Sequence, residues 1–187
     1  PFFTIIPSLC NTQFIDYQTP LGQKLFARAT ATLPELFDCT AKKMQEFLDN
    51  IQARSTSVGW SDILDIPKDL GNEETDYHNI LTEYGQVTLE QVQHHMETYI
   101  SEPVRDMQDS MQLYLCLKQS LTSEAKNKIL LHIMGYLVDG SDSGMCLLKV
   151  IIQESYLDTN MTDLFIRERL SSLDKYMAKV DSDILLF

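Results

Sequence analysis

A run of apolar residues near the end of the sequence constrains the fold most, because it recurs in an unbroken alternation of four and three positions. Its members are Ile166, Leu170, Leu173, Met177, Val180, Ile184 and Phe187. This spacing keeps them on one side of a helix, and we call them the C-terminal seam. A helix that packs on its own domain shows the same recurrence, so the seam indicates either an intramolecular core contact or a contact between subunits. Because Phe187 falls inside the pattern, we expect the natural chain to continue beyond it.

Helix-start signals recur along the rest of the chain. They are Thr40, Thr88, Pro103, Thr122 and Asn160. Thr88 is followed three positions later by Gln91, which is the pattern of a capping box, and Gly59 is suited to end the helix that starts after Thr40. Residues 2–6 and 14–17 read as extended chain on either side of a turn. The sequence therefore predicts an all-α fold, a multi-helix bundle with a short extended N-terminal arm or hairpin.

The apolar positions of these helices predict the core. The helix from Pro103 is expected to be central and to bury the stripe of Val104, Met107, Met111 and Leu115, broadened by Leu113 and Leu117. Ile129 is expected in the core as well, and Trp60 is expected to anchor a short turn. Met96, Met107, Met111 and Met134 lie at core-like positions, where methionine fills gaps, although a methionine-rich groove is the alternative. The polar stretch 65–86 predicts a long connection with one short helix near residues 77–84.

Composition and charge restrict the partners. A net charge of -12 argues against direct binding of nucleic acid, since that affinity comes largely from Lys and Arg. The mostly acidic residues between 62 and 106 favour a solvated acidic face, with a surface for a cation or a basic partner as the alternative. No apolar run reaches the length of a membrane span, and no signal peptide is recognisable, so we expect no membrane contact and a cytoplasmic location. The four scattered cysteines fit free thiols in a reducing compartment.

No motif in the sequence indicates catalysis. Phosphate-loop, dinucleotide-binding, nucleophile-elbow and zinc-protease signatures are all missing, so we predict that the chain is not an enzyme and has no cofactor. Glu90, His94 and Glu97 share a helix face and could offer ligands to a cation, but such triplets are common on exposed helices. We therefore predict no metal site. An enzyme whose site is assembled from scattered residues is the remaining alternative.

Two adjoining stretches resemble a known family. The wording GMCLLKVIIQESYLDT over 144–159, followed by IRERLSSLDKYM over 166–177, resembles the Gag polyproteins of long-terminal-repeat retrotransposons, especially copia-type Gag. The resemblance implies a capsid N-terminal-like helical domain over 1–135 and the start of a smaller, truncated capsid C-terminal-like helical domain over 136–187. Residues 140–144 would then be the linker.

The resemblance also implies a function. Such a chain would be a structural capsid protein that forms homo-oligomers and assembles into a shell packaging retroelement RNA. The RNA would be held indirectly, by a basic segment outside this chain, because the zinc knuckle of many Gag proteins is missing. The Q-G-x-x-E order of the retroviral major homology region is missing too. Pro1 is either a terminus exposed by proteolysis, as in retroviral capsids, or a mere boundary of the chain.

A second function fits the same helical patterns. A helical adaptor would bind another protein through an amphipathic groove, and a Gag-derived host protein would combine both descriptions. Self-association that depends on concentration separates the capsid hypothesis from the adaptor hypothesis.

Overall fold

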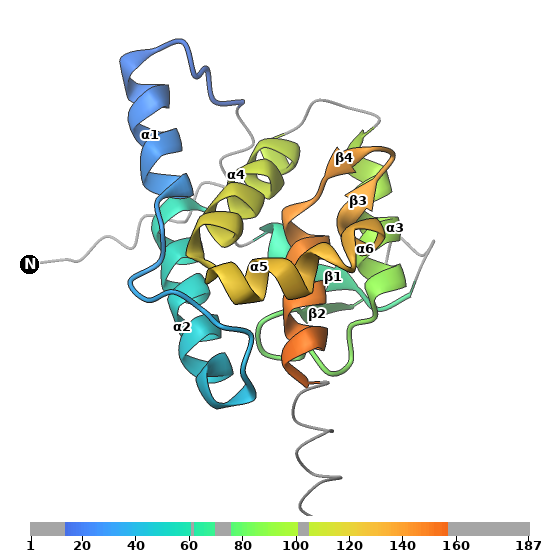
Figure 1. Ribbon diagram of the computed structural model, residues 1–187. Helices are drawn as coiled ribbons and strands as arrows, with labels where there is room; N and C mark the ends of the chain where they lie inside the picture. The colour runs from blue at the N-terminus through green and yellow to red at the C-terminus, as the bar shows by residue number, and fades with distance from the viewer. Residues whose placement is uncertain (1–13, 61, 70–75, 101–104, 157–187) are drawn as a thin grey trace, which may run out of the picture.

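The structure, a computed structural model, describes residues 14–60, 62–69, 76–100 and 105–156. Its elements follow the chain in the order α1 (Pro20–Thr30), α2 (Ala41–Val58), η1 (Asp62–Leu64), β1 (Asp65–Pro67), β2 (Tyr77–Asn79), α3 (Leu89–Ile100), α4 (Arg105–Ser120), α5 (Ser123–Leu130), α6 (Ile133–Tyr136), β3 (Leu137–Val138) and β4 (Ser141–Asp142). A further helix occupies 144–156. The fold is therefore mostly helical (Figure 1).

The helix over 144–156 contributes most of its length to the core. Seven of its apolar residues are buried, namely Met145, Cys146, Leu147, Leu148, Val150, Ile151 and Ile152. A helix that is apolar on all sides is a helix that others surround. In Figure 1 it lies at the centre of the view, with α2 on one side and α3 on the other. Its buried residues belong to the same core cluster as Phe47, Trp60 and Leu117.

That shared core bears on the predicted division of the chain. Buried residues before and after position 135 pack in one cluster, for example Ile129 and Leu148. Most of the predicted second domain, 157–187, lies outside the described residues, so the division itself stays a prediction. The prediction of a linker at 140–144 is wrong. Residues 137–142 form the β3–β4 hairpin, and Gly144 packs so closely on α4 that a Cβ there would lie 2.2 Å from the carbonyl oxygen of Ser110.

Two small antiparallel sheets qualify the all-α expectation. Strands β1 and β2 pair with Ile66 opposite His78, and β3 pairs with β4 around Asp139 and Gly140. The short helix predicted near 77–84 is wrong, because Tyr77–Asn79 is strand β2 and turns follow it. The polar composition of this region concealed a strand whose paired residues lie 10 to 14 positions away in the sequence.

The local helix signals at Thr88, Thr122 and Gly59 are confirmed. The Thr88 hydroxyl accepts from the Gln91 N–H at 3.1 Å, while the Gln91 side chain accepts from the Thr88 N–H at 2.8 Å. Thr122 caps α5 in the same way, and Gly59 ends α2 with a φ of 88°. Thr40 precedes α2 but makes no side-chain cap, since its hydroxyl donates to Asp38. The predicted starts at Pro103 and Asn160, and the predicted strand at 2–6, lie outside the described residues.

Helix α1 was not predicted, although its signals are ordinary. Thr19 caps the helix by accepting from the Gly22 N–H at 3.0 Å, and Pro20 occupies the first turn. The helix packs against α4 and α2. Arg54 of α2 holds the end of α1 by donating to four backbone carbonyls, those of residues 28, 29, 31 and 32.

Helix α4 exposes part of the face that the sequence predicts to be buried. Met107 and Met111 are each 41% exposed and Leu115 is only partly buried, so the predicted stripe is wrong for the two methionines. Val104 lies outside the described residues. Leu113 and Leu117 are buried as predicted. Several polar residues are buried too, namely Arg105, Gln108, Asp109, Ser110 and Gln112. The helix therefore buries these polar side chains beside Leu113 and Leu117, while Met107 and Met111 stay exposed.

The N-terminal segment explains how the polar side chains of Gln108 and Gln112 can be buried. The Ile15 N–H donates to Gln108 Oε1 at 2.7 Å, and Gln108 Nε2 donates back to the Ile15 carbonyl at 2.8 Å. Gln112 Nε2 donates to the Tyr17 hydroxyl at 2.7 Å, and the Trp60 indole donates to Gln112 Oε1 at 3.3 Å. Each buried amide thus has partners, which is what makes its burial tolerable. Trp60 is the core anchor that the sequence predicts.

Asp109 gives this buried region a pH dependence. Burial raises the pKa of Asp109 to about 6, and the neighbouring Arg105 guanidinium only partly offsets that effect. Because an unfolded aspartate has a pKa near ~3.9, the extra stability that protonation of Asp109 gives to the folded protein is complete below about pH 4 and is lost as the pH rises through about 6. Asp109→Asn removes the titration and keeps an acceptor for Arg105. We expect the free energy of unfolding of the wild type, relative to this variant, to fall by about 1–3 kcal/mol between pH 4 and 7. Urea unfolding at several pH values measures this difference, and a difference that is flat with pH contradicts the assignment.

Candidate protein-docking groove

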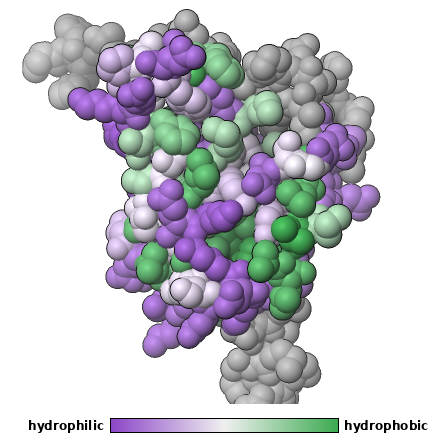
Figure 2. Space-filling model, turned by 45° about the horizontal axis from the view of Figure 1, so that its top comes forward, coloured by the Kyte–Doolittle hydropathy of each residue, from purple (hydrophilic) through white to green (hydrophobic). Residues whose placement is uncertain are grey.

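A groove of about 630 Å³ opens beside α6. We call it the α6 groove. Its lining comes from the turn after β2, the start of α3, the stretch that joins α5 to α6, and the helix over 144–156, and includes Tyr84, Gly85, Leu89, Leu131, His132, Met134, Gly135, Lys149, Val150, Ile152, Gln153, Glu154 and Tyr156. In Figure 2, hydrophobic side chains gather on this face over α5 and α6.

One wall of the groove is an exposed apolar run. Of the residues between 129 and 134, only Ile129 points into the core, while Leu131 is 83% exposed and Met134 is 78% exposed. Leu130 and Ile133 are exposed as well, but they line a separate pocket beside Tyr114 and Lys118. The predicted core position of Met134 is therefore wrong. Large apolar side chains gathered on a surface and rimmed by polar groups are typical of protein contact sites.

Polar contacts hold the opposite wall in place. His132 Nε2 lies 2.7 Å from Glu154 Oε1 and joins the α5–α6 connection to the helix over 144–156. Lys149 is buried, and its Nζ donates to the Tyr84 carbonyl at 2.6 Å. Burial lowers the pKa of Lys149. These contacts fix the floor and rim, so the groove is formed before anything binds.

Two tyrosines close one end of the groove. The rings of Tyr84 and Tyr156 lie 5.3 Å apart between centroids and are tilted by 37°. Burial, together with the neighbouring Tyr84, raises the pKa of Tyr156 to about 12. The Tyr156 phenol therefore presents a neutral hydroxyl beside an apolar ring face, which suits an amphipathic partner.

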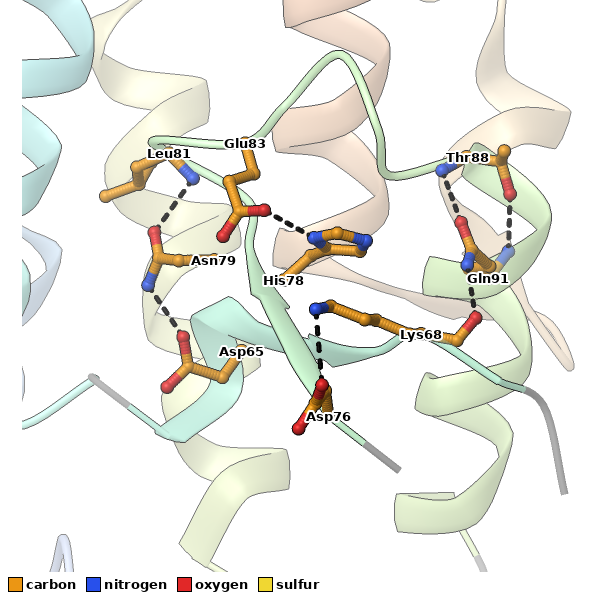
Figure 3. Close-up of polar contacts among 9 residues, drawn as sticks. All are labelled: Asp65, Lys68, Asp76, His78, Asn79, Leu81, Glu83, Thr88 and Gln91. Atoms are coloured by element: carbon orange, nitrogen blue, oxygen red, sulfur yellow. Dashed lines mark hydrogen bonds and ion pairs between the residues drawn. The ribbon is translucent and has the colours of Figure 1, made fainter. Parts of the chain in front are cut away.

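A polar network positions the turn that carries Tyr84 (Figure 3). His78 Nδ1 lies 2.6 Å from Glu83 Oε2, which ties β2 to the turn. Asn79 donates to Asp65 at 2.7 Å and accepts from the Leu81 N–H at 3.0 Å. On the far side, Gln91 donates to the Lys68 carbonyl at 2.9 Å. These contacts join β1, β2, the turn and α3 to one another, so the network supports the groove.

The described thiols are not built for nucleophilic chemistry. Cys39, Cys116 and Cys146 are free and buried, as the sequence analysis allowed. Burial raises the pKa of Cys39 to about 12 and that of Cys146 to about 11. A nucleophilic cysteine needs the opposite shift, because the thiolate is the reactive form.

The predicted helix-face triplet does not gather into a cation site. His94 Nδ1 lies 3.5 Å from Glu97 Oε2 on the exposed side of α3, and within the described ranges no cluster of three or more His, Cys, Asp or Glu side chains has the arrangement of a metal centre. Burial, with a smaller effect of His94, lowers the pKa of His95 to about 4, so that imidazole is neutral at pH 7.

The predicted and the observed candidate sites differ. Every member of the C-terminal seam, from Ile166 to Phe187, lies outside the described residues. The α6 groove was missed, because its exposed wall reads in the sequence as an apolar run interrupted only by His132, which periodicity assigns to a core. The apolar residues over 129–134 depart from strict helical spacing, and this departure was the signal that could have indicated an exposed surface.

The chain matches no known family of sequences. Nor does it match a characterised protein or a solved structure. Among the helices that the structure describes, none combines the length and apolar character required to cross a bilayer.

Proposed function

We propose that this chain is a structural, capsid-like Gag protein that associates with copies of itself to form a shell around retroelement RNA. The observation that supports this best is the α6 groove, a preformed apolar surface whose wall includes the exposed Leu131 and Met134. The sequence supplies a complementary element in the C-terminal seam. The net charge of -12 disfavours direct contact with RNA, so a basic segment elsewhere would hold it.

A second function has the same surface in its favour. A helical adaptor would use the α6 groove to bind an amphipathic helix of another protein, anchored by side chains at helical spacing. The two functions differ in one measurable property, because only the capsid-like protein must associate with itself.

Val180→Asp tests self-association. We expect the wild type to form assemblies that grow with concentration, and the variant to remain a folded monomer, because the substitution buries an unpaired carboxylate in the contact. Light scattering coupled to size-exclusion chromatography measures the mass, and parallel thermal melts report folding. Ser182→Asp adds the same charge off the seam and is expected to assemble as the wild type does.

Two results contradict the proposal. A wild type that stays monomeric at all concentrations favours the adaptor. A monomeric wild type whose melting temperature drops sharply on Val180→Asp places the seam within its own chain.

A further inference from the structure

We infer that the α6 groove receives the C-terminal seam of a second copy of this chain, so that subunits join head to tail. This inference rests on the proposed self-association and adds to it the identity of the two surfaces in contact. One surface is the groove described above, and the other is a segment of the same chain that follows the described residues.

The size of the groove suits part of the seam. Because an apolar cavity of ~150 Å³ holds one benzene molecule, a groove of about 630 Å³ admits about four groups of that size. Helices that bind in grooves present anchors at positions i, i+3 and i+7. Leu170, Leu173 and Met177 have this spacing, and the seam contains four more apolar residues than these three. The seam is therefore longer than the groove and would extend past it, as expected of a segment that links two subunits.

The position of the groove also fits. Tyr156, the last described residue, itself lines the groove, and the seam begins ten positions later at Ile166. Each chain thus carries a receptor and a ligand that are different from each other. A contact between unlike surfaces is heterologous, and repeating it produces rings or open chains of subunits instead of closed dimers. Extended shells require contacts that can repeat in this way.

Single variants of the full-length chain test each surface. Met134→Glu places a charge on the groove wall, where the side chain is 78% exposed in the free chain. Leu173→Asp does the same on the seam. We expect each variant to associate at least about 30-fold more weakly than the wild type, the effect of losing one interface hot spot, with an unchanged melting temperature. Leu21→Glu is the control, because Leu21 is 68% exposed on α1 and lies outside the groove. Sedimentation velocity over a range of concentrations gives the association constants, and Leu131→Glu repeats the groove test at a second position.

A mixture of the two variants is the decisive measurement. Met134→Glu keeps an intact seam and Leu173→Asp keeps an intact groove, so an equimolar mixture should form dimers that grow no further. If Leu173→Asp prevents association while Met134→Glu and Leu131→Glu assemble as the wild type does, seams pair with seams and the groove inference is overturned, although self-association stands. A wild type that never associates, with a lowered melting temperature for Leu173→Asp, overturns the inference and the proposed function together.

Discussion

Replacing Asp109 with alanine is expected to lower the free energy of unfolding by about 3–5 kcal/mol at pH 7, the usual cost of removing one partner of a buried ion pair. Arg105 Nε donates to Asp109 Oδ1 at 2.7 Å, and both side chains are buried. A guanidinium keeps its charge at any pH that the fold survives, so the variant leaves a buried cation without this carboxylate. Removing the other partner, in Arg105→Ala, should lower the free energy of unfolding by less, because the Asp109 carboxyl can take up a proton. Urea unfolding followed by circular dichroism measures both.

Two further variants separate the loss of the Arg105–Asp109 ion pair from the general cost of replacing an aspartate with alanine. Asp49→Ala makes the same substitution at an exposed position of α2 and should change stability by no more than about 0.5 kcal/mol. The double variant Arg105→Met, Asp109→Leu should recover most of the loss, since an apolar pair of similar volume often equals a buried ion pair. If Asp109→Ala and the wild type had the same free energy of unfolding, water would have to reach the Arg105–Asp109 pair.

Gly144→Ala is expected to lower the free energy of unfolding by about 2–3 kcal/mol. A Cβ at this position would lie 2.2 Å from the Ser110 carbonyl oxygen and 2.6 Å from the Tyr114 backbone nitrogen, so the helix over 144–156 must move away from α4. Overpacking of a core costs about 1–3 kcal/mol. The gain in helix propensity from replacing glycine is at most about 1 kcal/mol and cannot offset a clash with two backbone atoms.

The helix start at Gly144 is fixed by more than close packing. The Gly144 N–H donates to the Ser110 hydroxyl at 3.1 Å, and Ser143 caps the helix by accepting from the Cys146 N–H at 3.2 Å. Gly85→Ala is the matched control, because nothing lies within 4 Å of a Cβ built there and no strained backbone conformation is involved. Thermal and urea melts of the two variants compare them directly. A Gly144→Ala protein as stable as Gly85→Ala argues against the close contact.

Features that depend on neighbours in the sequence could be predicted. The capping box at Thr88, the cap at Thr122 and the stop at Gly59 each involve residues within four positions, so the sequence contains all the atoms that decide them. Trp60 was predictable for a related reason, because a large aromatic ring after a helix stop has few places to go except the core.

Features that depend on distant partners could not be predicted. The burial of Gln108 and Gln112 is decided by the backbone of residue 15 and the hydroxyl of residue 17, and helical periodicity carries no information about them. A rule that buries apolar residues therefore placed Met107 and Met111 inside. The α6 groove has the same origin, since residues 131–135 and the helix over 144–156, which line it together, are separated in the sequence.

The pairing of Ile15 with Gln108 has a consequence for how the chain is made. The two residues lie 93 positions apart, so at a synthesis rate of ~5–20 residues per second roughly 5–20 s separate their appearance at the ribosome. During that interval the N–H and carbonyl of Ile15 lack the partner that they have in the folded protein. Contacts between such distant residues also slow folding, because a long loop must close before they form. The first described residues of this protein therefore cannot reach their final places until Gln108 has been synthesised.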